Sequence, residues 1–301
     1  CGEAICLEQA AGRYVQAGCY TTAELAVTPC NAVLTSWNCD TPRGTACEVQ
    51  IRIFARGFWS RWMSYGKWSP FIRRQSVQNP VADSDNASLD GGTVHIKSPG
   101  GAEAVQLRIY LYSDDTQATP TVRLLAASVR PVQWQRNDGD AIQQRLLPCP
   151  AYTQNLRNPR FVGKISDAIA VTMLMNRWGE DLLPEEVAHT CYDFSAGANR
   201  SFTAALAGCY GYECFLRYAD LAFLKKEVKS GFACAAAVHY APDAETALEK
   251  NLPLVEGAPC AAQRHILVVR GFETDENGTE FVLVNDSRSA TDDTAVRRYT
   301  L

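Results

Sequence analysis

The sequence predicts two parts of different fold class, an all-β sandwich followed by an α+β domain. Residues 48–53 and 106–111 alternate polar and apolar side chains, which is the pattern of half-buried antiparallel strands. Residues 163–179 instead repeat apolar side chains at steps of three and four, which predicts a packed helix. After residue 149 helices precede an antiparallel hairpin, an order typical of α+β domains and not of βαβ nucleotide folds.

A polar stretch separates the two parts. Residues 131–148 carry Gln, Asn, Asp and Gly side chains between Pro131 and Pro148, a composition typical of linkers. A chain of 301 residues also suits two domains of ordinary size. We therefore predict a β-sandwich at 1–130, a linker at 131–148 and an α+β domain at 149–301.

Composition narrows the expected partners and cofactors. A net charge of −4 gives no reason to expect a nucleic acid, and no apolar run approaches the roughly 20 residues of a membrane span. The twelve cysteines form no C-x-x-C pair and no histidine has finger spacing, so we expect no metal and no cofactor. Several cysteines lie in apolar segments, which favours reduced core thiols in a cytoplasmic protein. A secreted or lipid-anchored protein remains open, because the sequence begins at Cys1 and a signal segment could have been removed.

The C-terminal part begins with the central helix at 163–179. Its predicted core stripe is Val171, Leu174, Met175 and Trp178. The remaining pattern predicts helices from 184, from 199 to about 211 and from 221 to 229; strands at 212–218, 232–240, 265–269 and 281–284; and a proline-containing loop, a candidate lid, at 241–263.

Four tryptophans crowd one stretch of the N-terminal part, namely Trp37, Trp59, Trp62 and Trp68. We expect them to fill the sandwich core, because large aromatic side chains usually do. The alternative is an exposed surface that binds a carbohydrate or a protein.

The hairpin places a histidine beside an aspartate. His265 opens one predicted strand, and Asp286 closes the next one. In a hairpin the start of one strand and the end of the next lie at the same edge, so the two side chains can be neighbours. A histidine oriented by a carboxylate is the arrangement of a general base. The alternative is a solvent-exposed histidine and an aspartate that opens a turn.

Ser166 stands where the central helix begins. Serine is a preferred N-cap, which predicts a structural role for its hydroxyl. A buried helix N-terminus also stabilises a nucleophilic anion, so Ser166 could instead occupy a nucleophile's position.

Motifs along most of the chain resemble bacterial two-domain, family thirty-nine-like cysteine peptidases, which have a papain-like second domain. The N-terminal motifs are Ser36-Trp37-Asn38, Pro42-Arg43-Gly44, Trp59-Ser60-Arg61-Trp62, Gly66-Lys67-Trp68-Ser69 and the 106–108 strand. The C-terminal stretches are 150–154, 173–179, 199–202, 265–272 and 284–286.

The resemblance implies a cysteine nucleophile at the start of the central helix. It also implies His265 as the base, Asp286 as the residue that orients it, and Gln154 as an oxyanion donor. The chain departs from the family at the nucleophile, where Ser166 is followed by Asp167-Ala168-Ile169-Ala170 instead of Ser-Pro-Thr-Ser. Ser166 is then an engineered replacement, a working serine variant or the mark of an inactive form. The expected function is amide hydrolysis on a peptide or protein substrate, and the alternative is a non-catalytic peptide- or carbohydrate-binding protein.

Overall fold

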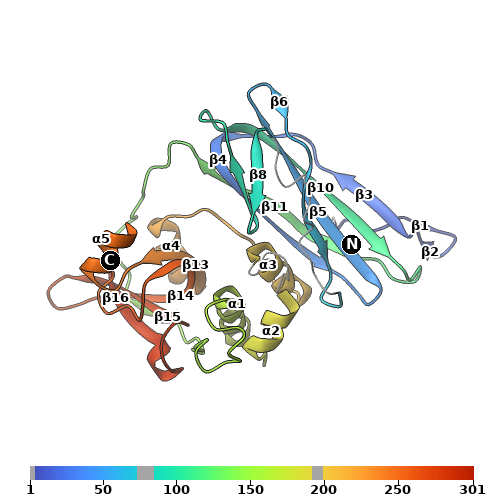
Figure 1. Ribbon diagram of the computed structural model, residues 1–301. Coiled ribbons are helices and arrows are strands. Elements are labelled where there is room, and N and C mark those ends of the chain that lie inside the picture. Colours follow the sequence, from blue (N-terminus) through green and yellow to red (C-terminus); the bar gives the residue numbers. More distant parts are fainter. Residues whose placement is uncertain (1–3, 73–84, 192–198) are drawn as a thin grey trace. The chain divides into compact units, whose positions relative to one another are not determined.

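The computed structural model describes residues 4–72, 85–191 and 199–301, which form two compact units (Figure 1). Unit 1 comprises Cys1–Gln135 together with Thr190–Tyr218, and unit 2 comprises Arg136–His189 together with Ala219–Leu301. The chain therefore passes between the units three times. The segment 190–218, which the sequence assigns to the C-terminal part, belongs to unit 1 by its contacts.

In the described residues, unit 1 is built on one curled antiparallel sheet of nine strands, β3–β11. The order β6-β5-β10-β4-β9-β8 runs across it, with β11 also on β4, β3 on β10 and β7 on β5. The strands are β3 (Ala17–Thr21), β4 (Leu25–Asp40), β5 (Thr45–Ala55), β6 (Phe58–Trp59), β7 (Met63–Trp68), β8 (Ala87–Asp90), β9 (Thr93–Ile96), β10 (Ala102–Ser113) and β11 (Thr121–Pro131). A small ribbon of β1 (Gln9–Ala10) and β2 (Arg13–Tyr14) stands apart from the sheet. Both segments that the alternation predicts as strands, 48–53 and 106–111, lie in the paired strands β5 and β10.

Helix α3 (Arg200–Cys209) packs against β4 within unit 1. Asn199 caps the helix by accepting a hydrogen bond from the Ser201 N–H, as the predicted helix start requires. Phe202 has no exposed surface and lies edge-on to the Trp37 ring. The sequence motif around Trp37 therefore forms part of the surface on which α3 packs.

The segment after α3 is not the strand that the sequence predicts at 212–218. It has no regular secondary structure, and its backbone bonds to side chains of the sheet instead of to another strand. The Asn38 amide donates to the Cys214 carbonyl at 2.8 Å and accepts from the Cys214 N–H at 3.1 Å. Ser36 Oγ accepts from the Leu216 N–H, and Ser128 Oγ accepts from the Tyr218 N–H.

Unit 2 combines a five-stranded antiparallel sheet with helices. In the sheet β14 pairs with β15 along one edge, while β12 and β13 pair with its other edge, and β16 adds to β15. The strands are β12 (Arg145–Leu146), β13 (Cys234–Tyr240), β14 (Ala262–Thr274), β15 (Glu280–Asp286) and β16 (Val296–Thr300). The helices are α1 (Ser166–Arg177), α2 (Pro184–Cys191), α4 (Leu221–Ser230) and α5 (Ala244–Lys250). α2 continues two residues into the stretch assigned to unit 1, and a short 3-10 turn, Asp293–Ala295, precedes β16.

Helix α1 packs against β13 and β14, and it buries every residue from Ala168 to Met173 as well as Met175. The predicted stripe is wrong at Trp178, which follows the helix and remains 55% exposed beside Phe232. The predicted loop at 241–263 is also wrong in part, because it contains α5. Asp243 caps that helix by accepting from the Thr246 N–H.

Candidate active site

His265 and Asp286 form a buried hydrogen-bonded pair in unit 2. The residue of β14 opposite Asp286 is Leu267, so Asp286 lies diagonally across from His265 on the same face of the hairpin. His265 Nε2 is 2.8 Å from Asp286 Oδ1, and neither side chain has any exposed surface. The structure thus brings together the two residues that the hairpin argument expects to be neighbours.

Asp286 accepts three further hydrogen bonds. The Tyr240 and Tyr299 hydroxyls donate to Oδ2 at 2.8 and 3.1 Å, and the Arg288 N–H donates to Oδ1 at 2.9 Å. Burial by itself would raise the pKa of Asp286. The hydrogen bond and charge of His265, with the Arg288 and Tyr240 donors, outweigh it and hold that pKa below its ordinary value. Asp286 is therefore a carboxylate over the physiological pH range.

The other ring nitrogen of His265 has no hydrogen-bond partner among the residues that the structure describes. Nδ1 is buried, and no described residue lies within hydrogen-bond distance of it. Because the ionised Asp286 accepts from Nε2, the proton of the neutral ring lies on Nε2 and the lone pair on Nδ1. The geometry thus leaves an oriented imidazole with one nitrogen able to take up a proton.

Gln154 is fixed in a loop that precedes α1. Its backbone N–H donates to the Ser287 carbonyl at 2.8 Å, directly after Asp286 in the chain. Its side-chain Oε1 accepts from the Gly163 N–H at 2.9 Å, and the side chain is buried. Since Oε1 is engaged, the amide Nε2–H₂ is the end that remains to donate to a bound group.

Ser166 is the first residue of α1 and not its cap. The N-cap is Ile165, without a side-chain cap bond, so the capping hypothesis is wrong. Ser166 Oγ donates to Asp167 Oδ1 at 3.3 Å. The first intrahelical hydrogen bond is donated by Ile169, which leaves the Ser166 N–H outside the helical ladder. Ser166 is partly exposed, and its hydroxyl is not hydrogen-bonded to His265.

Cys149 lies near α1 but lacks the properties of an activated thiol. Its Sγ donates to the Met173 carbonyl at 3.6 Å. Burial raises the pKa of this thiol to about 11, even though Arg270 and Arg177 act in the opposite direction. A reactive cysteine needs a lowered pKa, so Cys149 does not replace the missing nucleophile.

Across the described ranges, no group of three His, Cys, Asp or Glu side chains is arranged to hold a metal ion. Within the same ranges no helix is long and apolar enough to cross a membrane.

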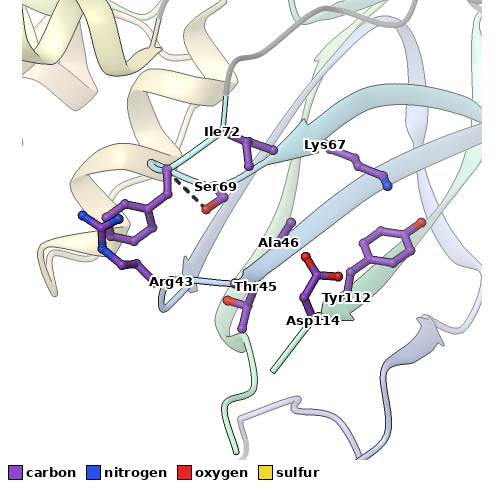
Figure 2. A pocket seen from close by; sticks show the side chains of 10 residues that line it. Arg43, Thr45, Ala46, Lys67, Ser69, Ile72, Tyr112 and Asp114 are labelled. Atoms are coloured by element: carbon purple, nitrogen blue, oxygen red, sulfur yellow. Dashed lines mark hydrogen bonds between the residues drawn. The ribbon is translucent and has the colours of Figure 1, made fainter. Parts of the chain in front are cut away.

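Unit 1 carries a hollow of about 380 Å³ beside the start of β5 and the end of β7, shown in Figure 2. Its two cationic side chains already have ring partners: Lys67 lies 4.4 Å from the Tyr112 ring centroid, and Arg43 lies 4.9 Å from that of Phe71. None of the four predicted site residues lines it.

The tryptophans divide into two pairs. Trp37 and Trp68 have no exposed surface, as expected of core residues. Trp59 and Trp62 are partly exposed, so the core prediction is wrong for them. The Arg52 guanidinium lies over both rings, at 4.5 and 4.9 Å, and the Arg108 guanidinium lies 4.3 Å from the Trp62 ring centroid. These cation–π contacts cover part of the ring surface on which a sugar would stack.

Two family models match the chain, one in each half. Residues 7–129 match the model described as the Peptidase C39 N-terminal domain, and residues 149–301 match the model described as the Peptidase_C39 like family. The chain belongs to the Peptidase_C39 like family. No curated protein and no solved structure matches it.

Proposed function

We propose that unit 2 is a papain-like peptidase domain that hydrolyses amide bonds of a peptide or protein. The observation that carries the proposal is the buried His265–Asp286 pair, in which Nδ1 of His265 has no partner in the described part of the chain. Membership of a peptidase-like family supports the same class of reaction. The curled sheet of unit 1 is then a sandwich-type accessory domain.

In this reaction the group at position 166 attacks the carbonyl carbon of the scissile amide while its proton moves to His265 Nδ1. The carbonyl oxygen becomes an oxyanion, which the Gln154 Nε2–H₂ and the Ser166 N–H stabilise. The C–N bond then breaks, and the leaving amine takes the proton from His265. Water, deprotonated by His265, hydrolyses the acyl-enzyme and regenerates the free hydroxyl or thiol.

The rate of this reaction depends on whether the attacking group is the hydroxyl of Ser166 or a cysteine thiol. A cysteine thiol is readily held as a thiolate by an imidazolium and a helix N-terminus, whereas an alcohol must lose its proton during the attack. Three hypotheses follow: an engineered replacement of cysteine, a working serine variant and an inactive form. The single Cys-to-Ser difference favours the first, and the rewritten Asp167–Ala170 stretch favours the third.

Hydrolysis of a peptide library by the chain as it stands, beside its Ser166→Cys variant, tests the proposal. Cleavage by the Cys variant alone would mean that the base and the oxyanion donors are intact. Equal cleavage by both forms, lost in His265→Ala, would establish a serine-dependent peptidase. Ser230→Cys, on an exposed serine of the same unit, controls for a new thiol elsewhere. No cleavage by either folded form would contradict the proposal.

The alternative is a peptide-binding protein without turnover, which the hydrogen bond of Ser166 to Asp167 favours. The alternative would be supported if peptides bound the full chain and its His265→Ala variant with equal affinity and neither form cleaved them. A carbohydrate-binding role for Trp59 and Trp62 is less well supported, because Arg52 and Arg108 lie over their rings. A glycan array with the full chain tests that role directly.

A further inference from the structure

Two tyrosines hold the carboxylate oxygen of Asp286 that is not bonded to His265. Tyr240 ends β13 and Tyr299 lies in β16, so they come from the two strands that flank the β14–β15 hairpin. Both hydroxyls donate to Oδ2, at 2.8 and 3.1 Å, and both side chains are buried. The Asp286 carboxylate therefore accepts hydrogen bonds from strands on both sides of the hairpin.

We propose that Tyr240 and Tyr299 are positioning residues for His265. Because they occupy Oδ2, and the Arg288 N–H occupies part of Oδ1, the carboxylate cannot rotate without breaking hydrogen bonds. Oδ1 therefore stays in the position that accepts from Nε2, which fixes the proton there and the lone pair on Nδ1. This inference rests on the proposed function of His265 as a base.

A purely structural role would be that the hydroxyls merely satisfy a buried carboxylate. That role predicts lower stability on their removal but no change in where His265 carries its proton. The positioning role predicts that the Nε2–H tautomer of His265 becomes less populated. The other ionisable groups near the cluster are Cys260, Arg297 and Arg288, whose guanidinium bonds to Cys260 Sγ and the Ala261 carbonyl. They stay unchanged when a tyrosine becomes phenylalanine.

The test is ¹⁵N NMR of the histidine rings in the full chain labelled at its four histidines, with His265 assigned by a His265→Gln variant. We expect the neutral His265 of the parent chain to carry its proton on Nε2. In Tyr240→Phe and Tyr299→Phe the Nδ1–H form should grow.

Tyr65→Phe, which removes a buried tyrosine hydroxyl of unit 1, is the matched control and should leave His265 unchanged. Folded tyrosine variants in which His265 keeps its Nε2–H tautomer to the same extent as in the parent chain would overturn the inference. Should Tyr240→Phe not fold, Tyr299→Phe alone decides, because its longer bond makes it the milder change.

The NMR readout does not depend on turnover, so it separates this inference from the proposed function. If Ser166→Cys cleaves peptides, adding Tyr240→Phe should lower kcat about tenfold while KM stays within about twofold. Cleavage with an unchanged kcat would overturn the positioning role and leave the peptidase proposal standing. If no form cleaves peptides but the tautomer shift is observed, the positioning role stands and the peptidase proposal is overturned.

Discussion

The strongest stability prediction concerns Asn38, which binds the segment after α3 in unit 1. Its side chain is 1% exposed and forms a two-way pair with the Cys214 backbone, at 2.8 and 3.1 Å. Asn38→Ala removes both hydrogen bonds and leaves the Cys214 N–H and carbonyl without them. Each such bond contributes about 0.5–1.5 kcal/mol net, and an orphaned buried group costs more. The expected loss is therefore about 2–3 kcal/mol.

Thermal unfolding measures this loss. For a unit of this size each kcal/mol corresponds to about 2–4 °C, so the Tm should fall by about 5–10 °C. Asn277→Ala, on an exposed residue of the β14–β15 turn, should change the Tm little. Hydrogen exchange localises the effect, since the amides of 212–218 should lose protection while those of β10 keep theirs.

The reasoning would be refuted by an Asn38→Ala chain whose Tm matches that of Asn277→Ala and whose 212–218 amides exchange as before.

The contacts of α3 with unit 1 also predict the behaviour of a chain cut at the linker. A fragment beginning at 149 would expose Phe202 and the rest of the α3 face that packs on β4. It should therefore aggregate or remain partly unfolded, and analytical ultracentrifugation detects this.

Three further predictions follow from close contacts and buried groups. Gly208→Ala should destabilise unit 1 by about 1–3 kcal/mol in chemical denaturation, because a Cβ would lie 2.8 Å from the Asn38 backbone. Asp286→Asn should destabilise the chain at neutral pH. This deficit should shrink as the pH falls below about 4, since a carboxylate with a lowered pKa contributes stability only while it is ionised. Cys149→Ala should leave any peptidase activity within about twofold of the parent, because burial raises the pKa of that thiol; a large loss would assign it a role.

The parts of the fold that depend on local sequence could be predicted. Asn199 caps α3 and Gly231 ends α4 in a left-handed conformation, both as residue type and position indicate. The pairing of His265 with Asp286 belongs to this group, because a short turn determines the register of a hairpin. Helix α5 belongs there as well, since Asp243 is an ordinary N-cap whose signal the proline content of the loop obscured.

The parts that depend on distant residues could not be predicted. Residues 212–218 have strand-like composition, but their backbone bonds to side chains about 90 to 180 positions earlier in the chain. Trp178 fits the helical period of the apolar side chains. The period does not show where the helix ends, and Trp178 lies just after its last residue. Tyr240 and Tyr299 carry no pattern that distinguishes them from core tyrosines, and only the sheet brings their hydroxyls to Asp286.

The chemistry of the Asp286 cluster argues that it is more than a stabilising device. Burying a carboxylate costs free energy that partners at best offset, and a well-packed apolar replacement is often as stable or more stable. The cluster provides Asp286 with four donors and yet leaves His265 Nδ1 buried without a partner among the described residues. A nitrogen without a protein donor adds no hydrogen bond within the described residues to the stability of the fold. A base held ready to accept a proton explains both features, whichever residue stands at position 166.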